Sequence, residues 1–227
     1  DETCGLAPAG EEHVSFLKMG IEAADTITTV SPNYAREIQT EAFGCGLHEL
    51  LSYRGVSGVV NGVDPASWNP ATDDVLAAQY TADDPSGKTL CRNALLTSVE
   101  WPTETPELLC GVVTRLADQK GLDWILGAVP HLSAIGARLV LLGTGDPELE
   151  AAVRSAMAEY PQSLAGWVRF DTDLSHQIIA GVDALLVPSR FEPCGLTQLY
   201  AMRYGTIPIV NPVGGLADTV QPYPDSP

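Results

Sequence analysis

Apolar and polar positions alternate in blocks along the second half of the chain. Continuous apolar runs over residues 108–114, 137–142, 184–187 and 206–210, with a shorter one at 168–170, predict strands. The stretches between them, over 122–132, 147–160, 176–182 and 196–204, predict helices. Strands that are apolar throughout are typical of parallel sheets covered on both faces. The pattern predicts an α/β domain with a doubly wound parallel sheet, whose ligands bind at the carboxyl ends of the strands.

The first hundred residues follow a different pattern. Short strands are expected over 26–30 and 56–60, and the polar segment 64–106 suits a connection with one helix near 88–96. We interpret residues 1–63 as the tail of an N-terminal domain and 64–227 as an incomplete C-terminal domain. A helix start at Gly214 and Gly215 comes shortly before the last residue. The chain is therefore expected to be truncated at both ends.

Charge narrows the classes of partner. The 227 residues include 12 Lys and Arg against 29 Asp and Glu, a formal net charge of −17. Such a surface repels nucleic acid and anionic membranes, so neither is an expected partner. No apolar run reaches the roughly 20 residues of a membrane-spanning helix, and the first residues do not resemble a signal peptide. An anionic ligand would need a local cluster of Arg and Lys.

The cysteines and histidines give no sign of a metal site. Five cysteines and four histidines are dispersed, without the spacing of metal ligands. These residues therefore predict no metal cluster, and no cofactor is expected. An odd, unpatterned set of cysteines favours a reducing compartment, such as a bacterial cytoplasm or a plastid.

Two cations follow the strand expected over 108–114. Arg115 and Lys120 would lie at the carboxyl ends of the strands of the sheet. An Arg can bind phosphate with a planar fork and a Lys adds a point charge, which suits a diphosphate leaving group. Two solvated surface charges would give the same pattern, and spacing alone does not separate the two interpretations.

A second loop combines a glycine, a helix start and a carboxylate. Gly195, followed by Leu196 and Thr197, allows close approach of the backbone to a ligand and offers free N–H groups to phosphate. Glu192 could hold a sugar hydroxyl or face a developing positive charge, or could merely interact with the helix dipole. Cys194 has no His near it in sequence, and we assign it no catalytic role.

Two glycine pairs also follow strands. Gly214 and Gly215 permit close approach to a ligand, although glycine is common in such turns. The pair Gly143 and Gly145 does not begin a dinucleotide-binding motif, because the third glycine of that motif would fall on Glu148.

Taken together, these loops resemble those of bacterial glycogen synthases and plant or algal starch synthases. The resemblance is carried by Thr114-Arg115-Leu116, Gln119-Lys120-Gly121, Gly143-Thr144-Gly145-Asp146-Pro147, the Ser-Arg-Phe-Glu-Pro-Cys-Gly-Leu-Thr block from Ser189 to Thr197, Gly214-Gly215-Leu216 and Asn61-Gly62-Val63-Asp64. It implies a GT-B fold of two Rossmann-like domains. Residues 1–63 would then be the tail of the N-terminal, acceptor-side catalytic domain, and residues 64–227 the incomplete C-terminal domain that binds the nucleotide sugar. The resemblance also implies transfer of glucose from ADP-glucose to the non-reducing end of an α-1,4-glucan, with retention and without a metal.

The resemblance also implies roles for individual residues. Arg115 and Lys120 match the pair that holds the donor diphosphate, and Glu192 matches the acidic residue beside the donor sugar. Gly195, Leu196 and Thr197 match the helix start at the phosphate, with Gly214 and Gly215 nearby. Phe170 matches the wall near the adenine.

Departures from the family pattern limit what this chain is expected to do. Val213 stands where relatives usually have Thr, and the family's N-terminal Lys-(Thr/Ser)-Gly-Gly loop is absent. By itself the chain is therefore expected to bind donor weakly and to transfer little glucose. A non-catalytic module that binds nucleotide or glucan remains an alternative, and a transferase with another donor is a weaker one. Glycogen, soluble starch and amylose are not distinguished as products.

Overall fold

The structure is a computed structural model that describes residues 15–104 and 108–223, and the chain divides into two compact units. The first unit runs to Asn61 and also takes in Glu192–Cys194 and the chain from Pro212 onward. The second comprises Gly62–Phe191 and Gly195–Asn211. The first change of unit lies close to the boundary expected after residue 63. The assignment of acceptor-side and nucleotide-sugar domains stays a prediction.

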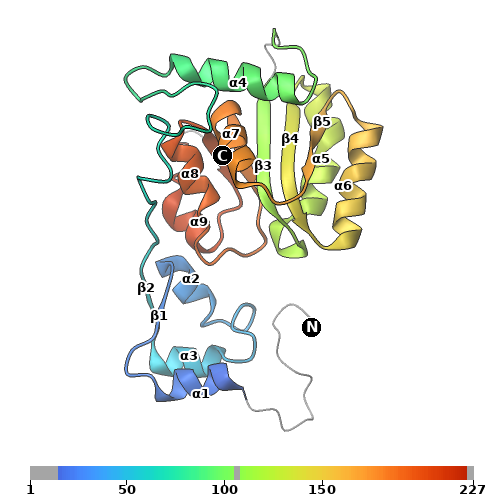
Figure 1. Cartoon of the computed structure of the whole chain (residues 1–227). Coiled ribbons are helices and arrows are strands. Elements are labelled where there is room, and N and C mark those ends of the chain that lie inside the picture. Colours follow the sequence, from blue (N-terminus) through green and yellow to red (C-terminus); the bar gives the residue numbers. More distant parts are fainter. Residues whose placement is uncertain (1–14, 105–107, 224–227) are drawn as a thin grey trace. The chain divides into compact units, whose positions relative to one another are not determined.

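The second unit is built on a five-stranded parallel sheet (Figure 1). Its elements are α4 (Ser86–Ser98), β3 (Leu109–Leu116), η1 (Asp118–Lys120), α5 (Leu122–Ala134), β4 (Arg138–Gly145), α6 (Pro147–Glu159), β5 (Leu164–Val168), α7 (Thr172–Gly181), β6 (Ala184–Val187), α8 (Thr197–Arg203) and β7 (Ile207–Val210). The strand order is β5-β4-β3-β6-β7, and all pairs are parallel. The predicted α/β class with a parallel sheet is confirmed.

Both faces of this sheet are covered, which explains the unbroken apolar runs. In β4, Leu139 and Leu141 join a core cluster that includes Ile125 of α5 and Val153 of α6. The alternate residues of β4 face a second cluster, which contains side chains of α4 and α7. Successive side chains of a strand point to opposite faces, so each face needs its own apolar set.

One strand–helix pair lies earlier in sequence than predicted. The strand expected at 168–170 is β5 at Leu164–Val168, and the helix expected from 176 is α7 from Thr172. Gly166 interrupts the apolar run of β5, and a Cβ there would lie 1.9 Å from the Leu141 carbonyl oxygen. Asp171 begins α7 because its Oδ1 accepts a hydrogen bond from the Leu174 amide at 3.0 Å.

The first unit joins segments from both ends of the described chain. It contains α1 (Phe16–Ala23), β1 (Thr28–Thr29), α2 (Pro32–Glu37), α3 (His48–Arg54), β2 (Ser57–Gly58) and α9 (Gly214–Thr219). The expected strands over 26–30 and 56–60 are present as β1 and β2, each only two residues long. Asp218 of α9 accepts hydrogen bonds from Ser31 Oγ at 2.6 Å and from the Asn33 amide at 2.8 Å, at the start of α2.

No helix within residues 15–104 and 108–223 has the length and hydrophobicity that a membrane crossing requires. Cys91, Cys110 and Cys194 are buried free thiols.

Candidate functional site

A cavity of about 720 Å³ lies at the carboxyl ends of β3 and β4, where the sheet topology predicts a ligand site. Its lining consists of Val113, Thr114 and Arg115 from β3, residues 142–145 from β4, residues 169–171 from the loop after β5, Thr172 and Ser175 from α7, and Trp68. Cavities of this size are typical of small-molecule sites. Of the predicted site residues, Arg115 and Phe170 line it.

Arg115 brings a guanidinium group to the edge of this cavity. Its side chain is exposed, and its Nη2 donates to Gln119 Oε1 at 3.3 Å. The second arginine of the lining, Arg169, is paired with Asp171 at 2.7 Å. The Leu174 amide first, and then Arg169, lower the pKa of Asp171, so this carboxylate stays charged and holds Arg169. Arg115 is thus the better placed of the two for an anionic ligand.

The two glycines at the end of β4 are needed for strand packing. A Cβ at Gly143 would lie 2.4 Å from the Thr114 carbonyl oxygen, and one at Gly145 would lie 2.2 Å from the Leu116 carbonyl oxygen. Glu150 of α6 fixes this end, because its Oε1 accepts from Thr144 Oγ1 at 2.6 Å and from the Gly145 amide at 3.1 Å. These two donors lower the pKa of Glu150.

Lys120 lies in η1, just after β3, and does not line the cavity. The loop that carries it is held against residues 188–191. Gln119 Nε2 donates to the Phe191 carbonyl oxygen at 2.9 Å, and the Gln119 carbonyl oxygen accepts from the Arg190 amide at 2.8 Å. Gly121, with a φ of 65°, allows this approach, because a Cβ there would lie 2.4 Å from the Pro188 carbonyl oxygen. Two of the predicted loops therefore lie side by side.

The helix start predicted near Gly195 is present, as α8 begins at Thr197. Gly195 has a φ of 73°, a conformation that favours glycine, and its carbonyl oxygen accepts from Gln198 Nε2 at 3.0 Å. Leu196 is the N-cap residue and makes no side-chain capping hydrogen bond. Gly195, Leu196 and Thr197 lie outside the lining of the cavity, so their contact with phosphate stays a prediction.

Glu192, Gly214 and Gly215 come together in the first unit. The Gly215 amide donates to the Glu192 carbonyl oxygen at 3.0 Å, and a Cβ on Gly214 would lie 1.8 Å from that same oxygen. The Gly214 amide donates to Glu37 Oε1 at 2.8 Å. Glu192 is 7% exposed. The two glycines are therefore required here by the backbone of Glu192, whatever they contact in a ligand.

Sequence reasoning missed several residues of the cavity. Trp68 lies in the segment that we interpreted as a polar connection, and an isolated tryptophan in that segment was the only sequence signal for it.

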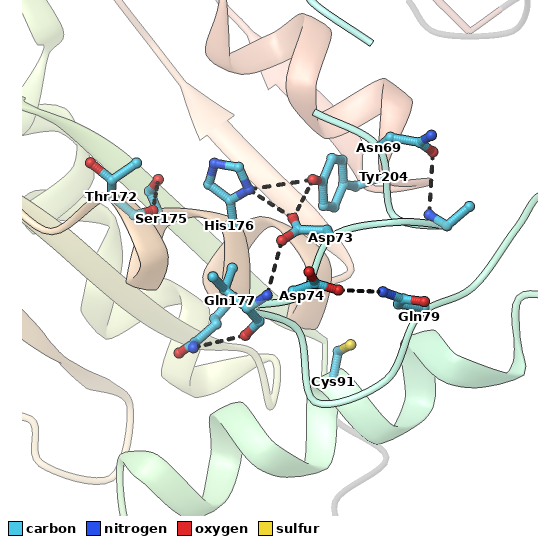
Figure 2. Close-up of polar contacts among 12 residues, drawn as sticks. Asn69, Asp73, Asp74, Gln79, Cys91, Thr172, Ser175, His176, Gln177 and Tyr204 are labelled. Atoms are coloured by element: carbon cyan, nitrogen blue, oxygen red, sulfur yellow. Dashed lines mark hydrogen bonds and ion pairs between the residues drawn. The ribbon is translucent and has the colours of Figure 1, made fainter. Parts of the chain in front are cut away.

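His176 is in the interior of α7 rather than at a helix start, which corrects its predicted position. It is buried, and its Nδ1 lies 2.7 Å from Asp73 Oδ2 (Figure 2). Within the part of the chain that the structure describes, no group of three or more His, Cys, Asp or Glu could hold a metal ion.

Comparison with known proteins identifies relatives for most of the chain. Residues 107–225 match the family model for glycosyl transferases group 1, and residues 6–53 match the model for the starch synthase catalytic domain. The chain is 50% identical over 214 residues to a glycogen synthase of Anaeromyxobacter sp. (strain Fw109-5), covering 93% of this chain and 45% of that protein. It is 52% identical over 212 residues to a glycogen synthase of Alkalilimnicola ehrlichii, covering 91% and 44%.

Solved structures agree with these matches. The catalytic domain of starch synthase IV from Arabidopsis thaliana, bound to ADP and acarbose, is similar with a TM-score of 0.88 and 39% identity, over 92% of this chain and 44% of that chain. Sucrose-phosphate synthase from Thermosynechococcus elongatus, at 23% identity and a TM-score of 0.61, is similar in fold alone, over 91% and 45%. The chain thus spans a little under half the length of these relatives. The family model that matches residues 107–225 covers more than half of this chain, and the chain belongs to the group 1 glycosyl transferases.

Proposed function

We propose that this protein is part of a glycogen or starch synthase that transfers glucose from ADP-glucose to the non-reducing end of an α-1,4-glucan with retention. The observation that carries the proposal is the cavity of about 720 Å³ at the carboxyl ends of β3 and β4, with Arg115 in its lining. The similar starch synthase IV was solved bound to ADP and acarbose, a nucleotide and a glucan-like ligand. This favours ADP-glucose as donor and a glucan as acceptor. We place the protein in a bacterial cytoplasm or a plastid.

The proposed reaction breaks the bond between the anomeric carbon of glucose and the β-phosphate oxygen of ADP. The electron pair of that bond leaves with ADP, and Arg115, Lys120 and the helix start at Gly195 stabilise its growing negative charge. The acceptor hydroxyl attacks the anomeric carbon from the same face and loses its proton to the departing phosphate. Glu192 orients the sugar and supports the positive charge that develops at the anomeric carbon. No metal is needed in this scheme, because cationic side chains neutralise the diphosphate.

Transfer is tested as incorporation of labelled glucose from ADP-glucose into glycogen, with the 227-residue chain and with the longest protein that its gene encodes. In an active enzyme, Lys120→Ala or Glu192→Ala should lower turnover by about 10²-fold or more. Lys18→Ala is the matched control, because Lys18 is exposed and pairs only at 4.0 Å with Glu22. Turnover within a few-fold of wild type in either test variant would contradict the assigned roles.

The donor and the absence of a metal are tested separately. ADP should bind more tightly than UDP in calorimetric titration, and EDTA should leave transfer unchanged. Tighter binding of UDP would contradict ADP-glucose as donor. Binding of ADP without transfer by the longest gene product would favour the non-catalytic binding module.

A further inference from the structure

Trp68 belongs to the strap, residues 62–85, which connects β2 to α4 and lies in the second unit. Its indole ring is stacked between two rings from different helices. The centroid of His176 of α7 lies 3.7 Å away at an interplanar angle of 19°, and that of Tyr200 of α8 lies 3.7 Å away at 5°. The same indole lines the cavity at the ends of β3 and β4. A residue of the strap is thereby built into the wall of the candidate donor site.

The stack is held by a buried polar network (Figure 2). Asp73 Oδ2 lies 2.7 Å from His176 Nδ1 and accepts a hydrogen bond from Tyr204 Oη at 2.5 Å. The side chains of His176 and Asp73 are only 11% and 6% exposed. Gln177 Nε2 donates to the Val75 carbonyl oxygen at 3.0 Å, which fastens the strap to α7 a second time. The ring of His176 therefore has little freedom to turn, and Trp68 is fixed with it.

The packing determines which part of Trp68 a ligand can meet. Both faces of the indole are covered, and the ring of Tyr204 contacts it edge-on at a centroid distance of 5.9 Å. The part of the Trp68 ring edge that Tyr204 does not contact is therefore the part that can line the cavity. An aromatic edge carries partial positive charge and packs well against the face of another aromatic ring. Because the indole is already immobilised, ligand binding would not cost its side-chain entropy.

We propose that Trp68 is a donor-binding residue, which contacts the nucleoside part of a nucleoside diphosphate sugar with the edge of its ring. Arg115 lines the same cavity and suits the phosphates, so the planar base or the ribose is the part left for an aromatic wall. Asp73 and His176 are positioning residues that act on the nucleotide through Trp68. The inference rests on the proposed function, because it assumes that the cavity takes a nucleotide.

Intrinsic fluorescence gives a direct test. The four tryptophans are Trp68, Trp101, Trp124 and Trp167, and Trp68 alone among them lines the cavity. ADP should change the emission of the wild-type chain, and Trp68→Phe should abolish this change while weakening binding only about threefold or less. Trp124→Leu is the matched control, because Trp124 is half-exposed on α5 outside the lining, and it should keep both the emission change and the affinity.

Calorimetric titration with ADP tests the contact between Trp68 and the nucleotide. It also tests whether His176 acts on the nucleotide through Trp68. Trp68→Leu should weaken ADP binding about tenfold, within the range of base–aromatic contacts. His176→Gln should also weaken binding in the wild-type background, but it should have no further effect in the Trp68→Leu background. A purely structural role of His176 would instead give additive losses. Circular dichroism and thermal unfolding check that each variant folds, and Trp68→Phe keeps the test informative if Trp68→Leu does not fold.

The outcomes separate this inference from the proposed function. If wild type binds ADP and Arg115→Ala weakens binding, while Trp68→Leu binds as wild type or Trp68→Phe keeps the emission change, the role of Trp68 is wrong and the proposed function stands. If wild type does not bind ADP, or Arg115→Ala leaves its affinity unchanged, the proposed nucleotide site fails and the inference fails with it.

Discussion

Replacing Lys88 by methionine tests how the second unit holds a buried amine. Lys88 of α4 donates from Nζ to the Ala180 carbonyl oxygen at 2.8 Å and to Thr206 Oγ1 at 2.7 Å. Both acceptors are uncharged. Burial lowers the pKa of Lys88 from 10.5 to about 8, and the more distant Asp183 only partly opposes this. The charged amine therefore ties α4 to the end of α7 and to the start of β7 at a cost in free energy.

The magnitude follows from the pKa difference between the folded and unfolded chain. Each pKa unit corresponds to about 1.4 kcal/mol, so a lowering from 10.5 to about 8 amounts to roughly 3 kcal/mol. Between these two pH values the unfolded chain binds more protons than the folded chain, so the stability conferred by Lys88 rises with pH. Below about pH 8 both states carry the charge and the contribution no longer changes. From about pH 7.5 to about pH 10 the gain should be about 2 kcal/mol.

The assay is urea unfolding followed by far-ultraviolet circular dichroism, for wild type and Lys88→Met at several pH values in this range. The useful quantity is the difference in free energy of unfolding between the two proteins. Titrating groups that do not contact Lys88, such as Tyr204, whose pKa burial raises, affect both proteins alike and cancel in this difference. The two lost hydrogen bonds add an offset that does not depend on pH.

Wild type should gain about 2 kcal/mol over Lys88→Met between the ends of the range. A difference that stays flat within the error of the extrapolation would show that the folded amine has an ordinary pKa. A difference that falls as pH rises would mean that the folded chain stabilises the charged form of Lys88. Either result would refute the reasoning from burial among neutral acceptors.

Two further predictions concern single backbone contacts. Asp218→Ala removes the acceptor of the Asn33 amide at 2.8 Å, should cost about 1–3 kcal/mol locally, and should speed hydrogen exchange of that amide. Asp218→Asn keeps an acceptor oxygen and should exchange more slowly than Asp218→Ala; equal rates in all three proteins would argue against the contact. Gly143→Ala places a Cβ 2.4 Å from the Thr114 carbonyl oxygen and should cost about 1–3 kcal/mol and weaken ADP binding. Gly127→Ala, in α5 with open space around it, should instead stabilise by about 0.5–1 kcal/mol, and matching thermal unfolding of both glycine variants would refute the packing argument.

The sequence alone predicted the elements whose signals are local. The strand over residues 184–187 is found as β6 with the same bounds, because its four apolar residues are buried or half-buried. Helix α6 begins as predicted, since Asp146 caps it and Pro147 occupies its first position. The position of Arg115 at the carboxyl end of a parallel strand also followed, because a buried strand and its next loop are adjacent in sequence. Such signals depend on residues within one turn or one strand.

Only the tertiary structure decided the contacts between distant segments. Asp73 and His176 are 103 positions apart, and nothing in the sequence near either residue predicts that the two side chains contact each other. Trp68 looked like part of a polar connection, and its place in the cavity depends on how the strap packs on α7 and α8. The grouping of α9 with α2 rests on hydrogen bonds of Asp218 across 187 and 185 positions. Periodicity and capping act over a few residues. The contacts of Asp73, Trp68 and Asp218 instead depend on how segments far apart in sequence pack against one another.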